Sequence, residues 1–466
     1  MSINPFEYNE DDIPLMEYGN IFAANTLWLR SGKDNQIATF EMTIRDLPKN
    51  WGYFLMFGLD RYLHHVKNFH FSEENLNILE KLGYIGEKEK EYYSKLRFTG
   101  EIWAIPDGTA FFPNEPIIRI TAPLIEANLL TALTLNVFSY PIRALTKVSR
   151  GKIASLDKRF AAGAAIRAQG LEQVPIILDA GYIAYGGDAI QPIFQKKHPE
   201  LINENNSMPN INHAVIKSFD SEREVFQLAL KECLPTLPSI SFMVDTYNLK
   251  KGLATLIEEI KKVDKNYYKK ISVVVDSGDV LKTAQYIRKT LNANLLNEVK
   301  ITAMSNLDEY KIDELEKNNS PINTYIAVTE VTNITDAPKL EMVYKMTQIV
   351  KKNGEVSYKA KLAKGKESYP GKKQIFRVKN KEGKMLKDII GLEDENLGER
   401  LLQLVMKNGE ILSKEDIHSK RALAKKSLDS LSNEIKKTYS TKKAPVEISP
   451  KLAKLFKETK KKHLTL

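Results

Sequence analysis

The stretch Val273-Val274-Val275-Asp276-Ser277-Gly278-Asp279 joins a short apolar run to a group of polar residues. Three similar runs stand at near-regular spacing around it, and each ends abruptly in polar side chains: residues 242–247, 301–306 and 325–330. Segments of helical character separate one run from the next. Because strands that alternate with helices build a parallel sheet or barrel, this pattern predicts an α/β fold over residues 211–345. The strand ends should then gather functional groups at one edge.

The Asp-Ser-Gly-Asp end of this stretch is the sharpest signal, because two carboxylates flank a hydroxyl and a glycine where a strand turns into a helix. Backbone N–H groups at such a turn suit a phosphate, and carboxylates suit ribose hydroxyls or a magnesium ion. An ordinary helix N-cap also favours Asp and Ser, so one such end alone is ambiguous. Four ends in series favour a functional site.

Bulk composition predicts a globular protein. The chain has 466 residues, enough for two or three domains, with 42% hydrophobic and 27% charged residues. No apolar run approaches the roughly 18 residues of a membrane span, and the acidic, polar start does not read as a signal peptide. The single cysteine, Cys233, excludes an intrachain disulfide and a multi-cysteine zinc site. We therefore expect a cytoplasmic protein without membrane association.

The net charge of +10 is concentrated at one end of the chain. Residues 411–466 hold 15 Lys and Arg against 6 Asp and Glu, so the rest of the chain is close to neutral. A nucleic-acid-binding protein is expected to carry its basic patch on the folded body, with aromatic residues interleaved. This distribution makes nucleic acid an unlikely partner.

The remaining patterns suggest three domains: an α/β domain over 1–135, an α/β barrel over 136–350 and a C-terminal domain with a basic tail over 351–466. Ser72 is expected to cap a helix. Residues 98–109, with an Asp-Gly turn, predict a hairpin or a meander. Apolar residues predict one long helix over 124–137 and another over 153–170, whereas the Asn-rich stretch 192–209 predicts a loop. Helices are expected after Ser413.

Several blocks of residues resemble the nicotinate phosphoribosyltransferase family in order and spacing from about residue 10 to residue 350. The blocks outside the βα region are Arg97-Phe98-Thr99-Gly100, Pro106-Asp107-Gly108-Thr109, Phe112-Pro113-Asn114-Glu115-Pro116, Ala122-Pro123-Leu124-Ile125-Glu126-Ala127 and Arg167-Ala168-Gln169-Gly170. Those inside or after it are Val244-Asp245-Thr246-Tyr247, Asp276-Ser277-Gly278-Asp279, Ser305-Asn306, Asp308-Glu309-Tyr310, Asp336-Ala337-Pro338 and Val343-Tyr344-Lys345.

This resemblance implies an irregular α/β barrel of the type II phosphoribosyltransferase kind, flanked by an α/β N-terminal domain, in a homodimer with the active site at the subunit interface. It also implies a reaction of NAD salvage. Nicotinate attacks the anomeric carbon of phosphoribosyl pyrophosphate to give nicotinate mononucleotide and pyrophosphate, with Mg2+ as cofactor and coupled hydrolysis of ATP. Carboxylates near an oxocarbenium-like ribose, and cations near the leaving group, would lower the barrier to this reaction.

The resemblance also assigns residues. His213, in Asn210-Ile211-Asn212-His213-Ala214, matches the family's transiently phosphorylated histidine, and a neutral imidazole is a competent phosphoryl acceptor. Asp276 is the second expected catalytic residue. Asp279 is a candidate magnesium ligand, and Arg167 is a candidate clamp for phosphate or carboxylate. The further expected substrate-binding residues are Asp245, Ser277, Gly278, Asp279, Ser305, Asn306, Thr329, Asn210 and Tyr18.

The chain departs from the family pattern at the substrate-binding positions. Val274 stands where the family has an arginine that is expected to hold the nicotinate carboxylate, and a valine cannot pair with that group. The tyrosine expected to stack on the pyridine ring aligns with Asn20, and Tyr18 is its possible substitute. The other departures are Asn210 for a threonine, Pro209 for a glycine, Ile166-Arg167 for paired arginines, and Ile326-Ala327-Val328-Thr329 for a Gly-x-Gly-Thr phosphate loop.

These departures leave three interpretations open. The first is an active nicotinate phosphoribosyltransferase, which is the interpretation we adopt. The second is a catalytically weakened relative with a binding or assembly role, and the third is a phosphoribosyltransferase for another base such as nicotinamide, since loss of the arginine could admit a neutral ring. A structure in which Arg143, Lys147 or Arg167 takes the place of Val274 would favour the first.

Overall fold

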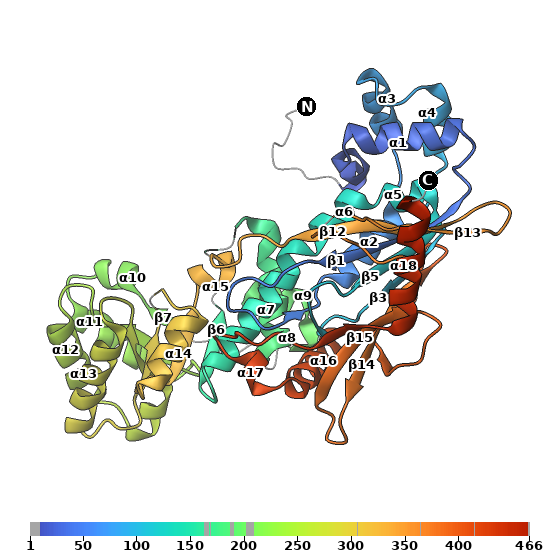
Figure 1. The fold of residues 1–466 in the computed structure, drawn as a ribbon. Helices are drawn as coiled ribbons and strands as arrows, with labels where there is room; N and C mark the ends of the chain where they lie inside the picture. The colour runs from blue at the N-terminus through green and yellow to red at the C-terminus, as the bar shows by residue number, and fades with distance from the viewer. Residues whose placement is uncertain are drawn as a thin grey trace. The chain divides into compact units, whose positions relative to one another are not determined.

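The computed structural model describes residues 10–162, 167, 169–186, 191–201, 209–304, 306–363, 365–413 and 415–464. The chain forms two compact units (Figure 1). Unit 1 comprises residues 1–142, 339–435 and 440–466, and unit 2 comprises residues 143–338 and 436–439. The C-terminal segment therefore belongs largely to the same unit as the N-terminal segment. Over the described residues, no helix has the length and apolar character needed to cross a membrane.

Unit 2 is built on a six-stranded parallel sheet of order β6-β11-β10-β9-β8-β7. Its strands are β6 (Arg159–Ala162), β7 (Asn210–Ile211), β8 (Ile240–Met243), β9 (Ile271–Val275), β10 (Lys300–Ala303) and β11 (Thr324–Ala327). The four predicted strand runs are β8 to β11, and they lie side by side in chain order. The expected parallel α/β fold is confirmed, in the form of a half-barrel.

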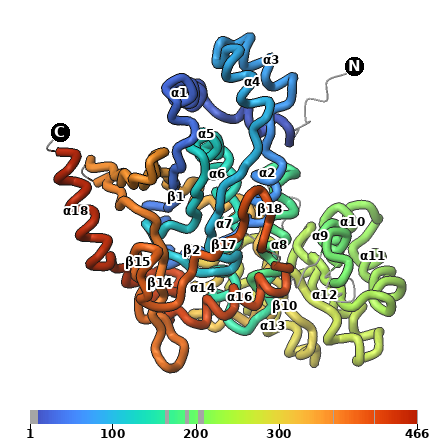
Figure 2. Tube along the Cα trace, turned by 90° about the vertical axis from the view of Figure 1, so that its right-hand side faces the viewer, coloured from blue at the N-terminus to red at the C-terminus, as the bar shows by residue number. Residues whose placement is uncertain are grey.

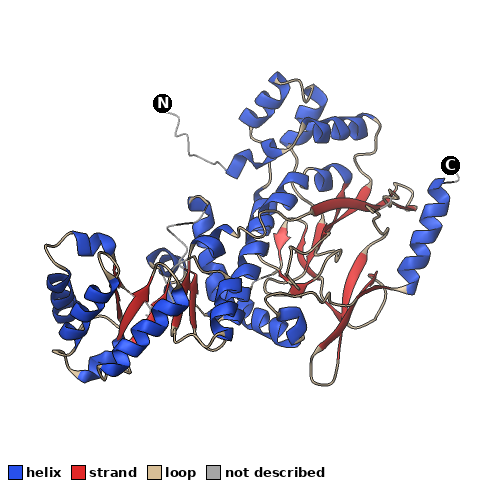
Figure 3. Cartoon of the chain, turned by 60° about the vertical axis from the view of Figure 1, so that its left-hand side comes forward, coloured by secondary structure: helices blue, strands red, loops and turns tan. Residues whose placement is uncertain are grey.

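Helices alternate with these strands, as Figure 3 shows in blue and red. They are α7 (Ser139–Ala154, whose first turn belongs to unit 1), η2 (Leu171–Gln173), α8 (Val174–Tyr185), α9 (Pro192–Lys197), η3 (Pro199–Leu201), α10 (His213–Lys217), α11 (Glu222–Leu228), η4 (Ala229–Cys233), α12 (Leu249–Ile260), η5 (Lys265–Lys270), α13 (Val280–Ala293), α14 (Glu309–Lys317) and α15 (Thr329–Asn333). All five residues of β9 are buried, as is typical of a parallel strand covered on both faces.

Unit 1 contains three sheets. A seven-stranded sheet has the order β13-β12-β1-β5-β3-β17-β18, a four-stranded sheet the order β16-β14-β15-β19, and β2 pairs with β4. The strands are β1 (Ile37–Ile44), β2 (Phe54–Leu55), β3 (Glu101–Ala104), β4 (Ala110–Phe111), β5 (Ile118–Pro123), β12 (Met342–Val350), β13 (Val356–Tyr358), β14 (Lys373–Lys379), β15 (Met385–Leu392), β16 (Glu399–Arg400), β17 (Gln403–Lys407), β18 (Glu410–Ile411) and β19 (Val446–Ile448).

The helices of unit 1 precede, interrupt and follow these strands along the chain (Figure 2). They are η1 (Glu10–Met16), α1 (Gly19–Arg30), α2 (Leu59–Asn68), α3 (Glu73–Lys81), α4 (Glu87–Ser94), α5 (Leu124–Asn128), α6 (Thr131–Val137), α16 (Ile417–Ser430), α17 (Asn433–Lys436) and α18 (Pro450–Leu464). Ser72 caps α3 as predicted, because its hydroxyl accepts a hydrogen bond from the N–H of Asn75 at 3.1 Å.

Several local predictions were wrong. Residues 124–137 form two short helices, α5 and α6, instead of one. The helix expected from residue 153 is in fact the end of α7, followed by the edge strand β6. The Asp-Gly turn does not close a hairpin, because β3 pairs with β5 and β17 whereas β4 pairs with β2. The predicted loop at 192–209 begins with α9 and η3.

Candidate active site

Three of the predicted site residues come from neighbouring strands of unit 2. His213, Asp245 and Asp276 follow β7, β8 and β9, which are adjacent in the sheet. Because the strands are parallel, their carboxyl ends meet at one edge, where functional groups converge in α/β folds. Asn212 fixes the start of α10, since its side chain accepts hydrogen bonds from the N–H groups of Ala214 and Val215. His213 is therefore held on the first turn of that helix.

His213 contacts side chains from both neighbouring strand ends. Its Nδ1 lies 2.9 Å from Oγ1 of Thr246. Its Nε2 lies 3.6 Å from Oδ2 of Asp276 and 4.0 Å from Oδ1 of Asp245. The side chain is 36% exposed, so a ligand can reach the ring. The protein thus orients the imidazole while leaving part of the ring accessible, which suits an acceptor of a transferred group.

The two carboxylates near His213 differ in their surroundings. Oδ2 of Asp245 accepts a hydrogen bond from Oγ of Ser277 at 2.5 Å. Burial raises the pKa of Asp276 above its usual value, and the charge of Asp245 raises it further, whereas His213 and Arg167 act in the opposite direction. Two close carboxylates disfavour joint ionisation unless a cation lies between or beside them. The cluster therefore favours a cationic group, such as a developing oxocarbenium ion or a metal ion.

The second half of the Asp-Ser-Gly-Asp stretch lies at the start of α13. Asp279 is its N-cap: Oδ1 accepts a hydrogen bond from the N–H of Lys282 at 3.1 Å, and Oδ2 pairs with Nζ of Lys282 at 3.1 Å. Gly278 has a φ of +71°, a conformation that glycine adopts without strain. The structure thus brings Ser277 into the cluster and shows Asp279 in a capping contact at half exposure.

The remaining predicted residues lie on several different elements. Arg167, beyond β6, is exposed, and its charge acts on Asp276. Thr329 begins α15 after β11, and Asn306 is exposed with a φ of +40° after β10. Asn210 lies on β7, three residues before His213. Tyr18 belongs to unit 1, where it precedes α1 with 75% exposure. Ser305 lies outside the described residues.

No group of three His, Cys, Asp or Glu side chains within the described ranges is close enough to hold a metal ion by itself. Mg2+ commonly binds through one or two carboxylates and completes its shell with water and substrate phosphates. The carboxylates of Asp245 and Asp276 fit that mode, because Oδ1 of Asp245 is buried without a hydrogen-bond partner in the part of the chain that the structure describes. These two residues would hold a substrate-bound Mg2+.

Sequence reasoning missed the hydroxyl that orients His213. Thr246 directly follows Asp245 in the stretch 242–247, so its place at a strand end was the available signal. Its role depends on the pairing of β7 with β8, which brings residues 33 positions apart into contact.

Two of the three cations considered for the place of the arginine expected at Val274 have partners elsewhere, and Val274 itself is 1% exposed on β9. Arg143 donates hydrogen bonds to the carbonyl oxygens of Ala337 and Pro338 at 2.9 and 2.8 Å. Lys147 pairs with Glu309 and Asp336, both at 2.6 Å. Of the three cations considered, only Arg167 acts on the cluster.

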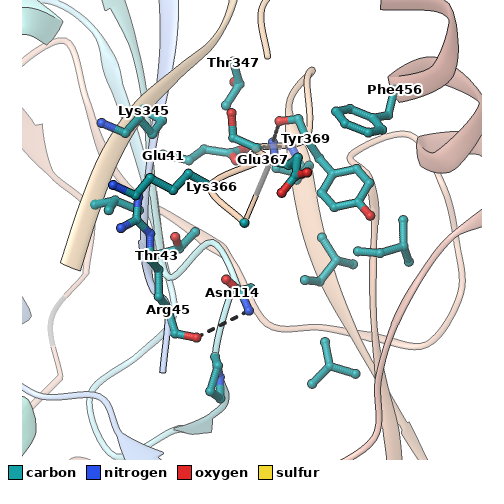
Figure 4. A pocket seen from close by; sticks show the side chains of 18 residues that line it. Glu41, Thr43, Arg45, Asn114, Lys345, Thr347, Lys366, Glu367, Tyr369 and Phe456 are labelled. Carbon is teal, nitrogen blue, oxygen red and sulfur yellow. Dashed lines mark hydrogen bonds and ion pairs between the residues drawn. The ribbon is translucent and has the colours of Figure 1, made fainter. Parts of the chain in front are cut away.

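Unit 1 holds a cavity of about 630 Å³ with a basic lining (Figure 4). Arg45 and Lys345 line it, and burial lowers the pKa of Lys345, as do the charges of Lys361 and Arg45. Lys373 is paired with Glu41 at 2.7 Å. Crowded cations whose charges repel one another favour an anionic ligand. Its other lining residues include Thr43, Asn114, Lys366, Glu367, Tyr369 and Phe456.

Comparisons with known proteins point to one family. Residues 22–139 match the nicotinate phosphoribosyltransferase (NAPRTase) N-terminal domain, and residues 397–456 match the nicotinate phosphoribosyltransferase C-terminal domain. The chain is 30% identical over 422 residues to nicotinate phosphoribosyltransferase pncB2 of Mycobacterium tuberculosis, covering 89% of this chain and 87% of that protein. It is 29% identical over 403 residues to the Bacillus subtilis nicotinate phosphoribosyltransferase, covering 84% and 79%.

The fold is likewise similar to solved structures. Human nicotinic acid phosphoribosyltransferase superposes with a TM-score of 0.74 at 19% identity, covering 95% of this chain and 99% of that one. A nicotinate-nucleotide pyrophosphorylase from Pyrococcus furiosus superposes with a TM-score of 0.69 at 19% identity, covering 91% and 97%. At this level of identity the likeness shows a shared fold, the mixed α/β architecture expected from the sequence.

Proposed function

The chain belongs to the nicotinate phosphoribosyltransferase family, and on that premise we propose that it is an enzyme of NAD salvage acting on small molecules. Nicotinate and phosphoribosyl pyrophosphate would give nicotinate mononucleotide and pyrophosphate, while ATP and water give ADP and phosphate. The observation that carries the proposal is the position of His213, with Nε2 within 3.6 Å of Asp276 at the carboxyl edge of the parallel sheet.

His213 is proposed to accept the phosphoryl group of ATP. The contact between Nδ1 and Thr246 orients the ring, and if Nδ1 carries the proton then Nε2 holds the free lone pair. Attack by that nitrogen on the γ-phosphorus forms an N–P bond as the bond to ADP breaks. Later attack by water on the phosphohistidine releases phosphate and restores the imidazole. Thr246 thus acts by fixing the ring orientation.

Asp276 is proposed to stabilise the transition state of glycosyl transfer. The nitrogen of the pyridine ring forms a bond to the anomeric carbon while the bond to pyrophosphate breaks, so positive charge develops on the ribose. A carboxylate whose ionised form is disfavoured by burial and by Asp245 gains most when that charge appears. A bound Mg2+ would offset the negative charge of the leaving pyrophosphate, and Asp245 and Asp276 are the residues proposed to hold it.

Arg167 suits a phosphate group of the phosphorylated substrates. Arg167 is exposed, and a guanidinium can bind two phosphate oxygens at once. Ser277, Gly278, Asp279, Asn306 and Thr329 remain proposed substrate-binding residues. We also propose a homodimer located in the cytoplasm, and light scattering on the purified protein would test the dimer.

Product formation tests the proposal directly. The purified protein would be incubated with phosphoribosyl pyrophosphate, Mg2+ and ATP, with nicotinate as the base. We expect nicotinate mononucleotide, an acid-labile phosphoryl group on the protein, and loss of that group in His213→Ala. A folded protein that forms no nucleotide and takes up no phosphate from ATP would contradict the proposal and favour the alternative of a binding or assembly role.

A further inference from the structure

The two faces of the parallel sheet in unit 2 are chemically different. In the register of the sheet, Asn210 is level with Ser241, Met243 with Val274, and Val274 with Thr302. Since side chains two residues apart on a strand share a face, these residues lie on one face. The opposite face carries apolar residues such as Phe242, which packs edge to face against Phe226 of α11. The face of Asn210 is therefore the one turned away from that helix, the inner face.

The inner face is strongly curved at its carboxyl end. Nδ2 of Asn210 on β7 lies 3.7 Å from Sδ of Met304, the residue after β10. In the sheet order, β8 and β9 separate these two strands, so in a flat sheet they would be about 14 Å apart. Their side chains meet because the sheet bends as in a half-barrel. Asn210 thus points across the concave side of the sheet.

Other polar side chains on this face, farther from its carboxyl end, have hydrogen-bond partners within the protein. Oγ of Ser272 lies 2.7 Å from Oγ1 of Thr302, and Oγ of Ser241 donates to the carbonyl oxygen of Pro209 at 3.1 Å. Asn210 differs, because its Oδ1 is buried with no hydrogen-bond partner among the described residues. Among the described residues, its Nδ2 donates to the thioether of Met304, a weak acceptor. A buried amide oxygen in this state can accept a hydrogen bond from a ligand.

Asn210 and Val274 flank the cluster that carries the chemistry. Asn210 precedes His213 by three residues, and Val274 precedes Asp276 by two. Near this end, the described strand residues of the inner face are Asn210, Met243, Val274, Ile326 and Ala161, and Met304 follows β10; none of them is a cation. The carboxylates of Asp245 and Asp276 come two residues after Met243 and Val274. Lys300 and Arg159 begin their strands, so they lie at the opposite, amino ends. Arg167 lies beyond β6 and is exposed.

We propose that Asn210 is the specificity-determining residue for the substituent of the pyridine ring, and that it reads this substituent by hydrogen bonding instead of by charge. This inference rests on the proposed function. The ring would lie against the side chains of Met304 and Val274, where a thioether makes favourable contact with an aromatic ring. Oδ1 accepts an N–H from a carboxamide, and Nδ2 donates to the oxygen of a carboxamide or a carboxylate.

Discrimination by a neutral amide has a definite consequence. A site that holds an anion by a cation rejects the neutral analogue strongly, because the cation is left unpaired. A site that reads the substituent through Asn210 has no cation to leave unpaired with either base. We therefore expect nicotinamide to be used as well as nicotinate, with values of kcat/KM that differ by less than about tenfold.

Substitutions at the two positions test this assignment with both bases. Asn210→Asp places a carboxylate against the substituent, so kcat/KM should fall about 100-fold more for nicotinate than for nicotinamide. Val274→Arg supplies a cation on the same face and should shift the ratio toward nicotinate. Ser241→Ala, on the same face but paired with Pro209, is the matched control and should leave the ratio unchanged. Thermal unfolding would confirm that each variant is folded.

Two further measurements separate the possible failures. Arg167→Gln should lower kcat/KM for both bases equally, and a selective loss of nicotinate use would show that Arg167 holds the carboxylate, which overturns the proposal. A wild-type preference for nicotinate above about 1000-fold that Asn210→Asp does not change would also overturn it. If neither base yields product, the proposed function fails. Calorimetric binding of both bases then decides: selectivity altered by Asn210→Asp supports the assignment, and unaltered selectivity or no binding overturns it.

Discussion

Unit 2 contains two clusters of ionisable side chains that differ in burial and in pairing. Around Glu309, Lys147 and Arg150 make ion pairs at 2.6 and 2.9 Å, and all three side chains are at most 1% exposed. Around His213, two carboxylates lie at 3.6 and 4.0 Å from Nε2, and the three side chains are 13–36% exposed. The charged side chains of the first cluster, which we call the closed group, pair with one another. Those of the second, the open group, are accessible to a ligand.

The difference shows which matched blocks hold the fold and which hold the site. Asp308-Glu309-Tyr310 and Asp336-Ala337-Pro338 carried the family resemblance as strongly as Asp276-Ser277-Gly278-Asp279 did. In the structure, Lys147 joins Glu309 to Asp336, and Tyr310 donates a hydrogen bond to Asp336 at 3.1 Å. A largely buried network of ion pairs ties α7 to α14 and to the segment after α15. Substitution of a residue in this network should lower the stability of the protein, whereas substitution in the open group should lower its activity.

The largest effect is expected from Glu309→Gln. The variant leaves Lys147 and Arg150 buried without the carboxylate that compensates both charges, and breaking a buried pair in this way costs about 3–5 kcal/mol. Urea unfolding would measure the loss in the free energy of unfolding. Glu314→Gln is the control, since Glu314 pairs with Lys311 at the surface. Equal midpoints for the two variants would contradict the distinction between the closed and the open group.

Asp276→Asn should have the opposite signature. Removal of one transition-state stabiliser lowers kcat about 10²–10³-fold, or about 2.7–4 kcal/mol. At neutral pH the folded protein should nevertheless become more stable, because burial and Asp245 disfavour the ionised carboxylate that Asn replaces. A loss of both activity and stability would place Asp276 with the closed group.

The pH dependence of this gain follows from the raised pKa of Asp276. The folded state binds the proton more tightly than the unfolded state, whose carboxyl titrates near 3.8. Wild-type stability therefore decreases as the pH rises from that value through the higher folded pKa. The difference between Asp276→Asn and wild type should grow over the same range and vanish below it. Urea midpoints measured from acid to neutral pH would test this sign.

Thr246→Val should produce a smaller and more selective loss. Valine keeps the shape of threonine but removes the hydroxyl that contacts Nδ1 of His213, a hydrogen bond with a net contribution of about 0.5–1.5 kcal/mol. We expect phosphorylation of His213 by ATP to slow by up to about tenfold, while the rate without ATP stays the same. Single-turnover transfer from labelled ATP would measure it. Thr236→Val, at an exposed threonine, controls for general effects.

The sequence predicted the βα framework well because each of β8 to β11 is an apolar run with a polar end, a local signal. It failed where the outcome depends on distant residues. The two-residue strand β7 exists because β8 offers it a pairing edge, and the turn at Asp107-Gly108 separates strands of different sheets. Residues 129 and 130 divide an apolar segment into α5 and α6, although nothing in its composition indicates a break.

The sequence predicted which strand ends carry the site, and the structure shows which of their side chains are in contact. His213, Asp245, Asp276 and Ser277 were identified as strand-end residues of a resembling family, and the structure brings them together. Thr246 was not singled out, because its value depends on the proximity of His213 from another strand. The substitutions at Val274 and Asn210 were noticed separately, and only the sheet register shows that they share one face.

Asp279→Ala should have the smallest effect, and it tests whether Asp279 is only a helix cap or also a binding residue. Asp279 caps α13 through the N–H of Lys282, and that hydrogen bond lowers its pKa. The cap therefore stabilises the protein above the usual pKa of an aspartate, and this contribution is lost as the pH falls through the lowered value. Asp308→Ala removes the matching cap of α14, where Oδ1 accepts from Lys311 N–H at 2.7 Å. If Asp279 is only a cap, both variants lose a little stability and keep kcat/KM. If Asp279 also binds Mg2+, Asp279→Ala raises the Mg2+ concentration needed for half-maximal activity, because the loss of an oxygen ligand weakens metal binding. Asp308→Ala, which removes a cap on another helix, leaves that concentration unchanged.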